Sequence, residues 1–213
     1  MQSLDELLAA AEQAHGHLCA GQILGVRMAM LGCALLDIRD PRHDRADRKR
    51  LVTFIEIDRC ATDAIAVVTG CRLGKRALKF RDWGKMAATF IDLGPAAAAT
   101  PPAPDFTGSR AVRIAAIDSS KDRARELYPA LDKNAAQMRA YRELPDSELF
   151  STEWVRVPLS PSEMPGHKSA RVTCARCGEG INFAREIHSA SGETLCQACA
   201  SPTARYYQPL DSH

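Results

Sequence analysis

The stretch His15-Gly16-His17-Leu18-Cys19-Ala20-Gly21 places two imidazoles and a thiol within five residues, directly before a long apolar segment. Neutral imidazole nitrogen and thiolate sulfur are the ligands that Zn²⁺ and similar divalent metals select. Two further thiols, Cys60 and Cys71, follow in the same half of the chain. The stretch therefore predicts a metal site in the core. The alternative is a buried free Cys19 beside two histidines that cap helices.

A helix is predicted on each side of this stretch. Over residues 3–14, Ser3 can cap the first helix together with Glu6, and Gly16 ends it. Apolar residues recur with the helical period over residues 19–38, so Cys19 lies at a helix start, where the dipole favours a thiolate.

Three glycines of this second helix lie near one face: Gly21, Gly25 and Gly32. Such a face indicates close approach by a ligand or by another backbone, or glycines that a packed helix tolerates. Cys33, among apolar neighbours, is expected to be an inert core thiol.

The pattern that follows is typical of a mixed α+β domain. Residues 40–50 are charged and contain proline, and we expect a solvated loop there. Next we expect a strand over 51–57 with Cys60 after its end, and a helix over 63–69 capped by Thr62. A hairpin of strands 77–81 and 85–92 about a turn at 82–84 follows, and then a long loop over 94–104. The last predicted elements are a strand over 110–117, a helix from 118 or 119 to 128, a helix over 133–150 interrupted near Pro145, and a strand over 154–157.

Length and composition fit one domain with a small appendage: the chain has 213 residues, 46% of them hydrophobic. Three prolines and a glycine over 158–167 predict the boundary between a core domain at 1–160 and a module at 170–213.

The charge and the chain start narrow the functional class. A net charge of +2 disfavours bulk electrostatic binding to nucleic acid or to an anionic membrane. The start is acidic and lacks a signal-peptide core, and Gln22 and Arg27 interrupt the longest apolar segment. We therefore expect a cytoplasmic protein without a membrane span, in which the eight cysteines are metal ligands or redox groups.

The C-terminal module carries two Cys-x-x-Cys pairs, Cys174/Cys177 and Cys196/Cys199, with 18 residues between them. Each turn directs two thiolates at one point, and four thiolates close a tetrahedral zinc site with no open position. The spacing therefore predicts a structural zinc finger that depends on its metal for folding. The loop between the pairs has few basic residues, which disfavours contacts with phosphates.

The chain resembles the FmdE family, which is named for a component of formylmethanofuran dehydrogenase. The matching segments are His15–Gly21 running into Arg27, Cys60–Lys75 with its Thr-Gly-Cys-Arg-Leu-Gly-Lys ending, and Asp82–Ala87. The resemblance covers about residues 3–117, and the C-terminal module resembles the treble-clef finger that many members append. Where the family usually has proline, this chain has Ala20 and Ala61, which could loosen the turns that present the cysteines.

The resemblance implies an α+β core, an intertwined homodimer and a cleft in which His and Cys hold a metal. It implies no particular reaction. The chain lacks a ferredoxin-type cysteine run and a nucleotide fingerprint, so it is not itself the catalytic molybdenum or tungsten component.

Three functions remain open. The first is an enzyme or an oxidoreductase accessory that acts through a core metal, zinc or another divalent transition metal, held by His17, Cys19 and Cys60. The second is a module that handles a metal or a molybdenum cofactor for an oxidoreductase complex, and the third is a nucleic-acid-binding regulator that uses the finger, which the charge disfavours. Cys19, Cys71 and Lys75 are the candidate catalytic residues, with Asp63 a polar neighbour and His15 a supporting group or alternate ligand.

Overall fold

The computed structural model describes residues 1–94, 110–201, 203 and 205–207. It divides into two compact units, Met1–Leu159 and Ser160–His213. The loop predicted over 94–104 lies, apart from Gly94, outside the described residues. No helix in the described ranges is long and apolar enough to cross a membrane.

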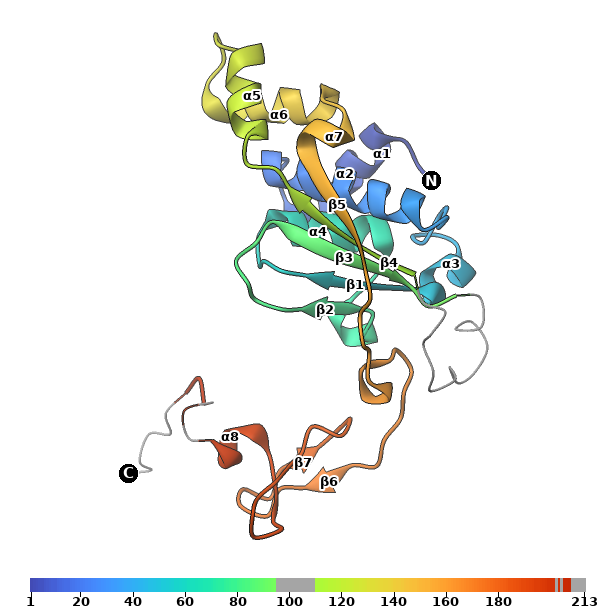
Figure 1. Cartoon of the computed structure of the whole chain (residues 1–213), viewed down its shortest axis with the longest axis vertical. Coiled ribbons are helices and arrows are strands. Elements are labelled where there is room, and N and C mark those ends of the chain that lie inside the picture. Colours follow the sequence, from blue (N-terminus) through green and yellow to red (C-terminus); the bar gives the residue numbers. More distant parts are fainter. Residues whose placement is uncertain (95–109, 202, 204, 208–213) are drawn as a thin grey trace. The chain divides into compact units, whose positions relative to one another are not determined.

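The first unit is built on a five-stranded mixed sheet with the order β2-β1-β3-β4-β5 (Figure 1). Strand β1 pairs in parallel with β2, and the other neighbours are antiparallel. The strands are β1 (Leu51–Ile55), β2 (Leu78–Phe80), β3 (Ala87–Asp92), β4 (Arg110–Ala116) and β5 (Phe150–Val155).

Helices α1, α2 and α4 cover one face of this sheet (Figure 1), and their apolar side chains share a core with Leu51, Phe90 and Ile114. The predicted α+β class is thereby confirmed. The helices are α1 (Leu4–His15), α2 (Ala20–Leu35), α3 (Arg45–Arg50), α4 (Cys60–Thr69), α5 (Ser120–Leu127), α6 (Lys133–Glu143) and α7 (Asp146–Leu149), with a 3₁₀ turn at Leu73–Lys75.

The first helix has the predicted ends. Ser3 and Glu6 form a reciprocal capping box, with the Ser3 backbone N–H 2.8 Å from a Glu6 carboxylate oxygen. Gly16 ends the helix at φ 97°, a left-handed conformation that glycine adopts without strain.

The predicted hairpin over 77–92 is wrong. Strands β2 and β3 are not neighbours, because β1 lies between them and pairs with both. The turn at Asp82-Trp83-Gly84 therefore belongs to a connection that crosses the end of β1, where the backbone N–H of Trp83 and that of Lys85 donate to the Glu56 carbonyl at 3.1 Å.

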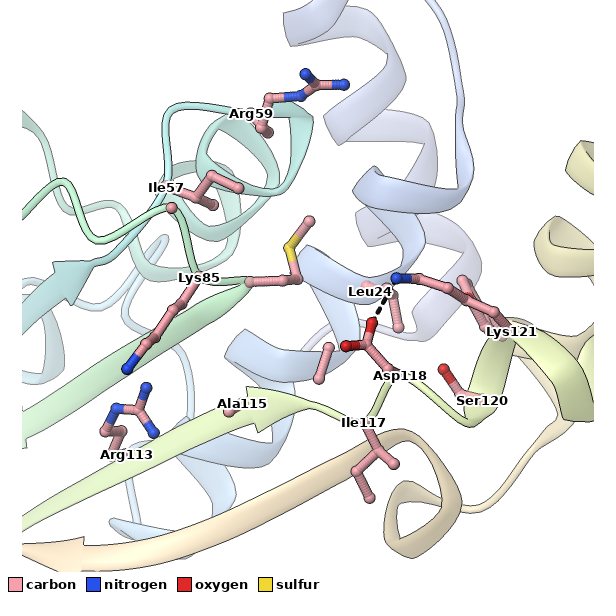
Figure 2. Close-up of a pocket in the computed structure, with 14 residues that line it drawn as sticks. Leu24, Ile57, Arg59, Lys85, Arg113, Ala115, Ile117, Asp118, Ser120 and Lys121 are labelled. Carbon is pink, nitrogen blue, oxygen red and sulfur yellow. Dashed lines mark hydrogen bonds and ion pairs between the residues drawn. The ribbon is translucent and has the colours of Figure 1, made fainter.

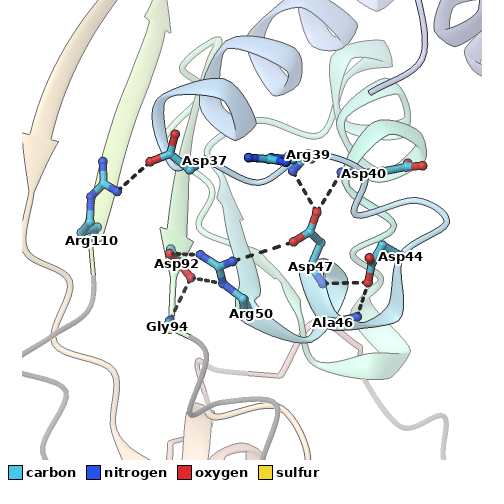
Figure 3. Close-up of polar contacts among 10 residues, drawn as sticks. All are labelled: Asp37, Arg39, Asp40, Asp44, Ala46, Asp47, Arg50, Asp92, Gly94 and Arg110. Atoms are coloured by element: carbon cyan, nitrogen blue, oxygen red, sulfur yellow. Dashed lines mark hydrogen bonds and ion pairs between the residues drawn. The ribbon is translucent and has the colours of Figure 1, made fainter.

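The charged segment 40–50 is not only a loop, since its second half forms α3 (Figure 3). Asp44 caps the helix, and the Asp47 carboxylate accepts hydrogen bonds from the backbone N–H groups of Arg39 and Asp40 at 2.8 and 2.9 Å. The Arg50 guanidinium forks onto the Asp92 carboxylate at 3.0 and 2.6 Å, and this contact raises the pKa of Arg50. These charges are paired with one another and serve to order the helix.

Two other boundaries differ from the prediction. The interruption expected near Pro145 is present, since α6 ends at Glu143 and the turn α7 follows Pro145, but Phe150, expected in the helix, begins β5. The strand expected over 154–157 is thus the end of a longer strand.

The second unit holds two short hairpins and a terminal turn of helix. The hairpins are β6 (Val172–Thr173) with β7 (Gly180–Ile181), and β8 (Ile187–His188) with β9 (Thr194–Leu195), and α8 covers Gln197–Ala200. The small core of this unit contains two cysteines and two aliphatic residues. Because this is little apolar surface, we expect the fold of the unit to depend on a metal that binds the thiols.

Candidate metal centres

Cys19 and Cys60 begin two helices of the first unit. Cys19 is the N-cap residue of α2, with an extended backbone (φ −139°), and its carbonyl accepts from the backbone N–H groups of Gln22 and Ile23. Cys60 follows the end of β1, as predicted, but it is also the first residue of α4, which begins earlier than the expected residue 63. Thr62 does not cap this helix, because its hydroxyl donates to the Ile57 carbonyl at 2.6 Å.

Two glycines bring the starts of these helices together. A Cβ atom added at Gly21 would lie 3.4 Å from the Cβ of Cys60, and one added at Gly25 would lie 2.9 Å from the Cβ of Ala64. The contact advances along both helices in the same direction, so α2 and α4 run parallel with their N-terminal ends adjacent. The close backbone approach that the glycine spacing indicated is confirmed, and two positive helix ends meet near the two thiols.

The environment of Cys60 reflects this pairing. Burial raises the pKa of the Cys60 thiol, and hydrogen bonding and charge from Cys19 raise it further. The positive charge of Arg59, which precedes Cys60 in the chain, acts to lower that pKa. Two thiolates side by side repel each other, so a cation is the natural way to stabilise both.

The two histidines lie at the end of α1 and in the bend that follows. The Nδ1 atom of His15 lies 2.8 Å from a carboxylate oxygen of Asp63 in the first turn of α4, and the rings of His15 and His17 are 4.8 Å apart. His15 is half-buried, whereas His17 is exposed. A carboxylate that orients an imidazole through one nitrogen is a common companion of metal-binding histidines.

The structure does not gather His17 with the two thiols into a compact ligand set. Within the described ranges, the one group of three or more His, Cys, Asp or Glu ligand atoms lying within 4.8 Å of one another is in the C-terminal unit. Metal binding by His17, Cys19 and Cys60 would therefore require the exposed imidazole to turn toward the thiols.

Cys71 and Lys75 lie elsewhere. Cys71 follows the far end of α4, and the ten residues of that helix span roughly 15 Å at 1.5 Å each. Its buried thiol donates to the Leu51 carbonyl at 3.5 Å and accepts from the Thr53 hydroxyl at 3.6 Å, and burial raises its pKa. Lys75 is exposed in the 3₁₀ turn. Neither residue is brought to the Cys19–Cys60 pair.

Cys33 matches its predicted role as an inert thiol. It is fully buried in α2, and burial raises its pKa far above the ordinary range.

A pocket of about 550 Å³ opens at the end of the sheet where β1 and β4 end and β3 begins (Figure 2). None of His17, Cys19, Cys60, Cys71 or Lys75 lines it. The charged groups that line it come from four segments: Arg59, Lys85, Arg113, Asp118 and Lys121. Sequence reasoning missed this site, because only the Gly84-Lys85-Met86 segment gave a signal and the others have no motif.

The four cysteines of the C-terminal unit form a compact cluster, with their sulfur atoms within 4.8 Å of one another. The Sγ atoms of Cys177 and Cys196 are 3.9 Å apart. Four sulfurs at about 2.3 Å from a tetrahedral zinc ion lie roughly 3.8 Å apart, so the cluster fits zinc or a similar metal. The four-cysteine metal-binding cluster predicted from the Cys-x-x-Cys spacing is confirmed.

Backbone N–H groups stabilise one thiolate of this cluster. Those of Cys177 and Cys196 lower the pKa of Cys174 to about 6. The N–H of Glu179 acts to lower the pKa of Cys177, but desolvation and hydrogen bonds with the other thiols outweigh it and raise that pKa to about 12. The Cys174 thiol thus ionises readily, whereas the thiols of Cys177 and Cys199, whose pKa values are raised, need a cation to stabilise their thiolates.

A solved structure shares the overall architecture. It is that of a protein from Syntrophus aciditrophicus described as similar to FmdE of a tungsten formylmethanofuran dehydrogenase, with a TM-score of 0.56, 21% identity, and coverage of 96% of this chain and 95% of that one. At this identity the likeness concerns the fold.

A curated relative matches a shorter segment. A protein of Archaeoglobus fulgidus described as a probable S-adenosyl-L-methionine-binding protein is 34% identical over 88 residues, which is 41% of this chain and 24% of the relative. The chain thus matches only about a quarter of that relative's length.

A match to a family model shows to which protein family the chain belongs. The model described as FmdE, Molybdenum formylmethanofuran dehydrogenase operon, matches residues 14–151, which include the His15–Gly21 stretch, α2, α4, strands β1 to β4 and the start of β5. The match covers more than half of the chain and bears out the resemblance that the sequence motifs indicated. This chain is a member of the FmdE family.

Proposed function

We propose that this protein is a metal-binding accessory of an oxidoreductase, in which the adjacent starts of α2 and α4 hold a divalent transition metal. The observation that carries the proposal is the pairing of Cys19 and Cys60 at two parallel helix N-termini. Both helix ends favour negative charge, and Cys19 is among the causes that raise the pKa of Cys60, so a cation between the two sulfurs would stabilise the Cys60 thiolate.

The imidazoles supply the further ligands. His17 is exposed and free to turn, while Asp63 holds the Nδ1 side of His15 and leaves its Nε2 atom available. Two thiolates with one imidazole leave a tetrahedral metal one open position, which is the arrangement that polarises a bound substrate. We propose His17 as the ligand and His15 as the oriented alternate.

The finger serves a structural role in this proposal. Four thiolates close the coordination of its metal, and Arg176 and Arg205 both donate hydrogen bonds to Cys199 within the finger. The net charge of +2 and the few basic residues between the two cysteine pairs favour the metal accessory over the nucleic-acid-binding regulator.

The test is the metal content of the full-length protein by elemental analysis. The wild-type chain is expected to carry a core equivalent besides the finger equivalent, Cys19→Ser to lose the core equivalent alone, and Cys199→Ser to lose the finger equivalent alone. Cys33→Ala, which alters a buried thiol of the same helix, is the matched control and should retain both. Full wild-type metal content in Cys19→Ser would contradict the core site.

A second candidate function comes from the Archaeoglobus fulgidus relative, described as a probable S-adenosyl-L-methionine-binding protein. The pocket of about 550 Å³ is within the size range of small-molecule sites. Four basic side chains around it disfavour a sulfonium cation, however. Calorimetric titration with S-adenosylmethionine decides this candidate, and heat with a saturable one-to-one isotherm would support it over the metal accessory.

A further inference from the structure

The pocket at the end of the sheet gathers cations that the metal site does not use. Arg59, Lys85, Arg113 and Lys121 line it, and Asp118 is its one carboxylate among the described residues (Figure 2). These cations come from the start of α4, the entry to β3, the middle of β4 and the start of α5. Their convergence follows from the fold, since they are distant in the sequence.

Two of the four cations are already compensated. The Arg113 guanidinium forks onto the buried Glu56 carboxylate at 2.7 and 2.7 Å, and Glu153 on the neighbouring strand adds to the negative charge around it. Lys121 donates to Asp118 at 2.5 Å. The Nη1 donors of Arg113 take no part in its two hydrogen bonds to Glu56, and the planar guanidinium fixes their direction.

The other two cations have no acidic partner. Within the described residues, neither Arg59 nor Lys85 forms an ion pair, and the ammonium of Lys85 lies 5.6 Å from the centre of the Trp83 ring. Figure 2 shows the Lys85 side chain reaching toward the Arg113 guanidinium. Two like charges that face one cavity are unfavourable unless an anion joins them.

A buried hydroxyl adds a neutral donor. Ser120 at the start of α5 is only 2% exposed, and what is exposed of it lines the pocket. A hydroxyl both donates and accepts hydrogen bonds, so it can contact a polar ligand atom there. Leu24, Met86 and Tyr141 complete the wall with apolar surface.

We propose that this pocket binds a small organic molecule through a doubly charged oxyanion group, with Lys85 and Arg59 compensating its charge and Arg113 and Ser120 donating hydrogen bonds. A phosphate monoester and a dicarboxylate both carry this chemistry. The apolar wall selects an organic body over an inorganic ion. The site is distinct from the Cys19–Cys60 pair and does not need its metal.

The test is calorimetric titration of the full-length protein with ribose 5-phosphate, succinate and inorganic phosphate at low ionic strength. At least one organic dianion is expected to bind more tightly than inorganic phosphate, and the affinity should fall as salt is raised. Lys85→Gln and Arg59→Gln should each weaken it roughly ten-fold, the loss of one charge-assisted contact. Lys133→Gln removes an exposed lysine outside the pocket and should change nothing.

Three outcomes would overturn the proposal. They are no binding of either organic dianion at millimolar concentration, equal losses in Lys85→Gln and Lys133→Gln, and tighter binding of S-adenosylmethionine than of the dianions. The Cys19→Ser protein should bind the dianion as the wild type does, so failure of the metal site and failure of this pocket are told apart.

Discussion

At the scale of single residues, Gly25 shows how a missing side chain positions the thiols. A Cβ atom there would lie 2.5 Å from the Ala61 carbonyl oxygen, which is backbone and cannot move aside. Gly25→Ala should therefore push α2 from α4 and destabilise the fold by about 1–3 kcal/mol, as other overpacked sites do. Urea unfolding measures this. Gly74→Ala is the control, since nothing lies within 4 Å of the Cβ position there.

If Gly25→Ala is as stable as Gly74→Ala, the close contact of the two helices is not what holds the thiol pair. The spacing of the glycines has three possible explanations: close approach of a ligand, close approach of another backbone, or glycines that a packed helix tolerates. The sequence could not decide among them, because Gly25 contacts Ala64, thirty-nine residues away, and tertiary packing determines that contact.

Arg27 links separate elements of the first unit. From α2 its guanidinium donates to the carbonyls of Tyr141 and Leu144 at 3.0 and 2.5 Å and to the Asp146 carboxylate at 2.6 Å. It thereby satisfies carbonyls at the end of α6 that have no partner within the helix. Sequence reasoning noted Arg27 only as a break in an apolar segment, because nothing local indicates which carbonyls it reaches.

Arg27→Gln should lower the free energy of unfolding by about 1–3 kcal/mol, because it leaves partly buried carbonyls unpaired. Arg27→Lys should recover only part of this, since an ammonium cannot reproduce the fork. Chemical denaturation of both variants against Arg45→Gln, at an exposed position of α3, measures the loss. Equal stability of all three would show that the contacts to α6 and α7 contribute nothing.

At the scale of elements, the sequence predicted where most helices and strands occur but not how they pair. Hydrophobic periodicity and the Ser3–Glu6 capping box are local signals, and they placed α1 and α2 well. The β2–β3 hairpin failed because a short connection favours antiparallel neighbours, whereas β1 inserts between them through pairing that the local pattern does not encode.

The four-cysteine cluster and the pocket also differ in whether local sequence patterns predict them. Four cysteines in two local pairs predict their own cluster, and the structure assembles it. The pocket draws its charges from four segments with no shared motif, so only the fold reveals it.

At the scale of the whole molecule, the two units should lose structure separately. The C-terminal core contains Cys174, Ile181, Leu195 and Cys199, too little apolar surface to fold without a metal. Cys199→Ser should therefore unfold residues 170–201 while the main thermal transition of the first unit stays unchanged. Hydrogen exchange by mass spectrometry separates the two regions, and loss of protection throughout the first unit would contradict their independence.

We predict a homodimer, which the family resemblance implies. Helix α2 packs within its own unit, against α1, α4 and the sheet. Strand β5 is one edge of the sheet; it pairs only with β4 among the described strands and presents Trp154 at 56% exposure. An edge strand of this length is a ready partner for a second copy.

Light scattering should give about twice the chain mass of 23.2 kDa at micromolar concentration. Trp154→Glu should shift the protein toward the monomer, whereas Trp83→Glu, at a comparably exposed tryptophan outside β5, should not. A wild-type mass of a single chain would count against the dimer.

The central claim is that Cys19 and Cys60 bind a metal at the joined starts of α2 and α4, and cobalt substitution tests it most directly. In a full-length chain with all four finger cysteines changed to serine, added Co²⁺ should give the sulfur-to-cobalt charge-transfer absorption of a thiolate-bound ion. Adding Cys19→Ser or Cys60→Ser to this chain should abolish the band, and adding Cys33→Ala should preserve it. Absence of the band in the finger-free chain, or its persistence without Cys19, would contradict the account.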